Sequence, residues 1–72
     1  MVSKIAQILE ILGDGEWHSL LELQDEVGVT NGRLLEVLGF LSQYEFLKVD
    51  YINERAIIAK KVQEFMAQKA TL

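Results

Sequence analysis

His18 is the only histidine in the sequence, and it stands directly before a serine, Ser19. A serine and a histidine can form part of a hydrolytic triad, and a histidine can bind a metal ion. However, Ser19 is placed to cap a helix, and no cysteine or second histidine could complete a metal site around His18. Nucleophile–base pairs, phosphate-binding loops and ligand clusters are missing from the pattern of residues. The sequence therefore predicts that the protein is not an enzyme and has no cofactor or metal.

The composition predicts one small globular domain over residues 1–72. Half of the residues are hydrophobic, which favours a packed core over disorder. Cysteine is absent, which favours a cytoplasmic location for so small a domain. The apolar runs are shorter than a membrane span, and the first residues lack the pattern of a signal peptide, so no membrane partner is expected.

A first helix is predicted from Val2 to Leu12, because apolar residues recur there with helical spacing. The run Gly13-Asp14-Gly15 ends this helix, with glycine in the left-handed conformation. A short extended link, Glu16-Trp17-His18, follows. We expect Trp17 to pack in the core beneath the next helix.

Two capped helices joined by a tight turn are predicted next. Ser19 and Glu22 have the spacing of a capping box, and the helix that they begin ends at Gly28. Thr30 caps a second helix that extends to Tyr44. Its apolar stripe consists of Leu34, Val37, Leu38, Leu41 and Tyr44.

Two residues of this second helix have alternative interpretations. Gly39 is costly in the middle of a helix, so either another group approaches it closely or the position is a tolerated weak point. Phe40 lies away from the core stripe. It is either half-buried beneath the segment that follows or an exposed anchor for a partner.

The last third of the chain predicts a β-hairpin and a final helix. Residues 46–51 and 55–58 alternate in the manner of strands around a turn at 52–54, and residues 60–69 have helical spacing. In the alternative, Asn53 caps one long helix from Glu54 to Lys69. The hairpin is favoured because a strand over 46–51 needs a partner for its backbone groups. The predicted fold class is therefore mainly α with a small antiparallel hairpin (α+β).

The order of these elements resembles the winged helix-turn-helix family over nearly the whole chain. The resemblance is carried by GEWHSLLEL at 15–23, GVT at 28–30 and LSQYEFL at 41–47. It implies a three-helix core with a wing and a C-terminal helix. Glu45 stands where the family has a glycine after the recognition helix. The wing loop is also short and has no basic tip.

The resemblance implies a transcription regulator of the small prokaryotic or archaeal kind, with double-stranded DNA as its partner. In that family, helix 31–44 would read the major groove with its N-terminal residues. Asparagine can pair with adenine, arginine can pair with guanine, and a helix N-terminus can hold a phosphate. The predicted nucleic-acid-binding residues are Thr30, Asn31, Arg33, Gln43, Lys48 and Arg55.

The charge of the chain favours a different function. The net charge is −4, and residues 19–58 contain three basic and seven acidic side chains, whereas DNA binding depends on neutralising phosphates. The alternative function is therefore a winged-helix module that binds protein, with little or no DNA binding. A homodimer through the terminal helices is also expected. Phe65, Met66 and the stripe of the first helix leave more apolar surface than one small core covers.

Overall fold

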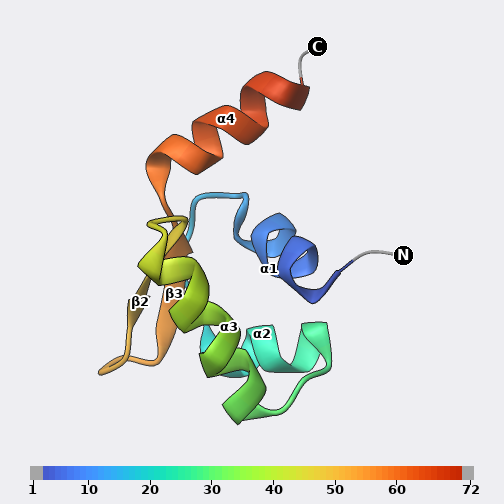
Figure 1. Cartoon of the computed structure of the whole chain (residues 1–72), viewed down its shortest axis with the longest axis vertical. Coiled ribbons are helices and arrows are strands. Elements are labelled where there is room, and N and C mark those ends of the chain that lie inside the picture. The colour runs from blue at the N-terminus through green and yellow to red at the C-terminus, as the bar shows by residue number, and fades with distance from the viewer. Residues whose placement is uncertain (1–2, 71–72) are drawn as a thin grey trace.

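Four helices and a three-stranded antiparallel sheet form the fold of residues 3–70, which a computed structural model describes, with side chains as far as Met66 (Figure 1). In chain order the elements are α1 (Lys4–Leu12), β1 (His18–Ser19), α2 (Leu20–Val27), α3 (Asn31–Gln43), β2 (Leu47–Asp50), β3 (Arg55–Ile58) and α4 (Lys60–Ala70). The predicted α+β class is confirmed. None of the helices within residues 3–70 is long and apolar enough to cross a membrane.

Helix α1 begins after Ser3, whose hydroxyl accepts a hydrogen bond from the amide of Ala6 at 3.1 Å. The predicted start at Val2 lies outside the described residues. The expected left-handed glycine is not at the cap itself, because Gly13 has a right-handed φ of −63°. Gly15 has the left-handed backbone instead, with φ of 79°, and a Cβ there would overlap the side chain of Gln63 in α4. The left-handed turn therefore comes three residues after Leu12, the last residue of α1.

The caps of α2 and α3 agree with the predictions. The Ser19 hydroxyl accepts from the Glu22 amide at 3.0 Å, and the Thr30 hydroxyl accepts from the Arg33 amide at 3.3 Å. Gly28 ends α2 with a left-handed φ of 73°. Only half of the predicted capping box forms, since the Glu22 carboxylate bonds the ring of His18 instead of the Ser19 amide.

The hairpin, and not the long helix, follows α3. Strands β2 and β3 pair from Leu47 with Ile58 to Asp50 with Arg55. Strand β1 pairs with the other edge of β3, with His18 opposite Ala56, so β3 is the central strand. The Asp50 carboxylate accepts hydrogen bonds from the backbone and the side chain of Asn53 and thereby closes the turn.

The core lies where α1, α2 and α3 pack against the inner face of the sheet. Its buried residues are Ile8, Leu12, Leu20, Leu23, Val27, Leu34, Leu38, Leu41, Leu47, Ala56 and Ile58. Two sequence-based expectations about this core are wrong. Tyr44 is 57% exposed and leaves the α3 stripe, and Trp17 is 42% exposed because it packs on Arg55 instead of beneath α2.

Helix α4 leaves the end of β3 and extends away from α2 and α3, above α1 in the view of Figure 1. Val62 and Met66 pack against the core from this helix. Phe65 remains 65% exposed. An 11-residue helix is marginally stable in water by itself, so α4 depends on this apolar contact.

The end of α3 has the hydrogen bonds of a Schellman motif. The Phe46 amide donates to the Leu41 carbonyl, and the Glu45 amide donates to the Ser42 carbonyl, each at 3.0 Å. This motif places Glu45 in the left-handed region, with φ of 62°. A glycine at this position, as in the family that the sequence resembles, would adopt this backbone without steric cost.

We expect Glu45→Gly to raise the free energy of unfolding by about 1 kcal/mol, because a left-handed backbone costs residues with a Cβ about 1–2 kcal/mol. Urea unfolding measures the change. The matched control is Glu36→Gly, which makes the same exchange inside α3 and should lower the free energy by about 0.5–1 kcal/mol. Loss of stability in both variants would contradict the assigned backbone at Glu45.

Alanine substitutions distinguish the two interpretations of Gly39, a close approach by another group or a tolerated weak point. No described atom lies within 4 Å of a Cβ built at Gly39, so Gly39→Ala should stabilise the protein by about 0.8–1 kcal/mol. Gly28 is equally open but left-handed, so Gly28→Ala should destabilise it by about 1–2 kcal/mol. Thermal unfolding of both variants gives the signs. A destabilising Gly39→Ala would show that another group does approach this face.

Candidate interaction surfaces

Helix α3 presents two different flanks beside its buried stripe. At about 100° per residue, Arg33, Phe40 and Tyr44 fall on one flank, whereas Asn31 and Leu35 fall on the other. The contacts agree with this division. Phe40 and Tyr44 pack on each other, and Asn31 and Leu35 line a groove on the far side. Asn31 and Arg33 therefore face different surroundings although they are two residues apart.

The predicted DNA-reading residues at the start of α3 are exposed. Thr30 and Asn31 both lie at the surface, and the Arg33 guanidinium is 3.5 Å from the carboxylate of Glu36, which shares the outer face of the helix. Gln43 is also exposed, but twelve residues of helix place it about 18 Å from Asn31. On the exposed face of α3, the cation Arg33 and the anion Glu36 are therefore in loose contact with each other.

The two predicted contacts on the β2–β3 hairpin lie on the outer face of the sheet. Lys48 and Arg55 alternate with buried residues of β2 and β3, so they point away from the core face against which α3 packs. Arg55 is already engaged. Its Nε is 3.2 Å from Oδ2 of Asp50, and its Cζ is 4.2 Å from the ring centroid of Trp17. The pKa of Asp50 is lowered, first by hydrogen bonds from Asn53 and then by Arg55. The six predicted residues therefore do not form one surface.

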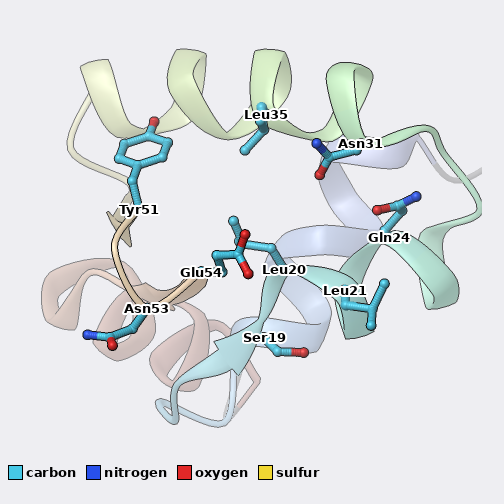
Figure 2. A pocket seen from close by; sticks show the side chains of 9 residues that line it. All are labelled: Ser19, Leu20, Leu21, Gln24, Asn31, Leu35, Tyr51, Asn53 and Glu54. Carbon is cyan, nitrogen blue, oxygen red and sulfur yellow. The ribbon is translucent and has the colours of Figure 1, made fainter.

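A groove of about 480 Å³ lies between α2, α3 and the turn after β2 (Figure 2). Figure 2 shows Asn31 and Leu35 pointing into it from α3, with Tyr51 of the turn at the end of the groove opposite Asn31. The remaining lining residues are Ser19, Leu20, Leu21, Gln24, Asn53 and Glu54. Glu54 is the single charged residue of the lining, so this groove offers no cation to a phosphate backbone.

Three aromatic rings form a continuous row at the other flank of α3. The ring centroids of Phe40 and Tyr44 are 5.0 Å apart, and those of Tyr44 and Phe46 are 6.5 Å apart. All three residues are exposed, Phe40 by 51% and Phe46 by 40%. We call this row the aromatic strip. It supports the exposed-anchor interpretation of Phe40 over burial beneath the hairpin.

The aromatic strip continues into a groove of about 420 Å³ between α1 and α4. Phe46 belongs to both. The groove, called the apolar groove below, is lined by Leu9, Phe46, Lys61, Val62, Phe65 and Met66. Lys61 is the only polar residue among them.

Three lysines gather beside the apolar groove. Lys48, Lys60 and Lys61 line a shared hollow between β2, the end of α3 and the start of α4. Lys61 lines both the hollow and the apolar groove. Among the described side chains, none of the three forms an ion pair or a side-chain hydrogen bond, whereas Lys4, Arg33 and Arg55 each have a partner. Lys60 and Lys61 are not among the binding residues predicted from the sequence. The available signal was that two adjacent lysines stand at the start of a predicted helix.

His18 links two parts of the chain through its ring. Nε2 lies 3.0 Å from the Asp14 carboxylate, and Nδ1 lies 2.7 Å from Oε1 of Glu22. A neutral imidazole has one N–H, so both bonds can form only with the protonated ring. The hydrogen bond to Asp14 accordingly raises the pKa of His18, and Glu22 adds to the effect. The pKa of Asp14 is lowered, first by the Glu16 amide and then by His18.

This ion pair satisfies the histidine without a metal. Within residues 3–66, no three His, Asp or Glu side chains are arranged to hold a metal ion. Both ring nitrogens of His18 already have carboxylate partners. The geometry therefore gives His18 a structural role.

We expect stability to depend on pH through His18. Because its folded pKa is raised, its stabilising contribution is complete below the unfolded value of about 6.5 and is lost as pH rises through the folded value. Urea unfolding at about pH 5.5 and 8.5 should therefore show a loss of stability at high pH that His18→Gln reduces. His18 is the only histidine, so the comparison isolates this group. Equal pH dependence in the two proteins would contradict the bridge.

Comparison with protein-family models, with curated proteins and with solved structures found no match to this chain. The surfaces described above therefore carry the functional argument by their own geometry. They offer an exposed start of α3, a groove without a cation in its lining, and an aromatic strip that joins an apolar groove and three lysines without an ion pair among the described side chains.

Proposed function

We propose that this chain is a winged helix-turn-helix module that binds another protein. The topology supports the family resemblance. Helix α2, a short turn and α3 are followed by the β2–β3 hairpin in the place of a wing, with β1 as the third strand. We propose a binding role without catalysis.

The aromatic strip is the observation that carries this proposal. Monomeric soluble proteins rarely expose contiguous apolar patches larger than a few hundred Å², and larger patches rimmed by polar residues mark interaction sites. Aromatic residues and methionine are enriched at such interfaces. Phe40, Tyr44 and Phe46 lead without interruption into an apolar groove edged by Phe65 and Met66.

The distribution of cations supports a protein partner over DNA. The exposed face of α3 has Arg33 as its cation, and Glu36 opposes it. Asp50 neutralises Arg55 on the outer face of the sheet. Phosphate neutralisation supplies most of the non-specific affinity for DNA, and this arrangement offers little of it.

Double-stranded DNA is the second candidate partner. It is favoured by the exposure of Thr30, Asn31 and Arg33 at the start of α3, the part of a helix-turn-helix that reads bases. The Thr30 hydroxyl is held by the cap, which leaves Asn31 and Arg33 as the base-reading side chains. Gln43 would add a contact only from the far end of α3, and Lys48 and Arg55 only from the outer face of the sheet.

Fluorescence polarisation with a random 20-base-pair duplex separates the two candidates. At about 50 mM salt, where non-specific binding is strong, we expect no saturation up to about 100 µM protein, the weak end of the usual non-specific range. Arg33→Ala and Lys61→Ala are matched variants that report on α3 and on the lysine hollow. Saturable binding that is lost in Arg33→Ala and retained in Lys61→Ala would establish the DNA function instead.

A further inference from the structure

We propose that the protein partner brings an acidic amphipathic helix, which lies in the apolar groove with its carboxylates toward Lys48, Lys60 and Lys61. This inference rests on the proposed function and names the partner of that surface. In this proposal, α1 and α4 make the hydrophobic contact with the partner, and the three lysines select a partner that is acidic.

The apolar groove has the chemistry that receives the apolar face of a helix. Leu9 comes from α1, whereas Val62, Phe65 and Met66 come from α4, and Phe46 connects the groove to the aromatic strip. Helices that bind in such grooves insert apolar side chains spaced at i, i+3, i+4 and i+7. The lining offers almost no hydrogen-bonding group to an extended peptide backbone, whereas a helix satisfies its own.

The charges at the end of the groove select an acidic partner. The three free lysines line the hollow with one acidic residue, Glu45. This local excess of positive charge is present in a chain whose net charge is −4. On α2 the exposed side is acidic, with Glu22, Asp25 and Glu26. Complementary charge at the lysine hollow and repulsion elsewhere would together set the position of an acidic helix.

A second copy of the chain matches this surface less well. A two-fold interface places the same patch on both sides, so each copy would bring the same three lysines, with Glu45 as the one acidic residue of the hollow's lining. A single-stranded nucleic acid would use the lysines and could stack bases on the strip. However, its polar phosphates find no counterpart in the apolar groove. Both occupants are outcomes of the experiment below.

The test uses two fluorescent 15-residue helical peptides, capped at both ends, with leucine at i, i+3, i+4 and i+7. Glutamate fills the exposed positions of one peptide and lysine fills those of the other. We expect the acidic peptide to bind at least about tenfold more tightly, a difference of about 1.4 kcal/mol. Its affinity should fall as salt is raised. The net charge of the protein would by itself favour the basic peptide, so this preference is a stringent result.

Matched variants locate the site. Lys61→Glu should remove the preference for the acidic peptide, whereas Arg33→Glu, the same change of charge on α3, should leave it unchanged. Phe65→Ala should weaken binding of the acidic peptide at least about thirtyfold, as expected at an interface hot spot. Ile52→Ala is its control, because Ile52 is 92% exposed in the turn after β2 and outside the groove. Circular dichroism and urea unfolding verify that each variant is folded.

Other outcomes overturn the inference in distinguishable ways. Equal binding of both peptides would overturn the acidic partner and leave the protein-binding function standing. Self-association that Phe65→Ala abolishes would assign the groove to a second copy, as in the predicted homodimer. Binding of an oligothymidylate that depends on Lys61, without peptide binding, would assign the surface to single-stranded nucleic acid. Failure of both peptides together with duplex binding through Arg33 would overturn the proposed function itself.

Discussion

The packing of the α3 leucine stripe against the inner face of the sheet is the constraint on which the rest of the structure depends. Leu34, Leu38 and Leu41 share one buried cluster with Leu47 and Ile58. This contact fixes the rotation of α3 about its axis. It also turns the outer face of the sheet, with Lys48 and Arg55, away from the helix. The division of the surface into separate faces follows from this one contact.

The same rotation decides what α3 offers to a partner. Once its leucines are buried, Phe40 and Tyr44 must lie at the surface on one flank, next to Phe46. Asn31 turns toward the groove between α2 and α3 (Figure 2). A helix of the same sequence rotated by one residue would bury Tyr44 and expose a leucine. The aromatic strip is therefore a consequence of core packing, and the proposed binding surface and the core are specified together.

Most of the fold could be predicted from the sequence because its signals are local. Ser19 and Thr30 are caps that bond an amide three residues away, and the turn at 52–54 lies between two strands of alternating pattern. The errors concern contacts that the hydrophobic and capping patterns do not reveal. Trp17 packs on Arg55, which is distant in sequence. Glu22 bonds the ring of His18, which is only four residues away, and does not complete the capping box.

The candidate site could be predicted less well, for a related reason. The number of charged side chains is known from the sequence, but which of them form ion pairs depends on the fold. Arg55 was predicted as a DNA contact, yet Asp50 faces it across the hairpin. Lys60 and Lys61 are separated from Lys48 by the whole hairpin in sequence, and the fold brings them into one hollow.

The central claim is that the aromatic strip is exposed to solvent, whereas the leucine stripe of α3 is buried. The most direct measurement is the broadening of aromatic and methyl NMR signals by a soluble nitroxide. We expect strong broadening of the Phe40 and Tyr44 ring signals and protection of the Leu34 and Leu38 methyl groups. Protection of Tyr44 together with broadening of Leu38 would contradict it.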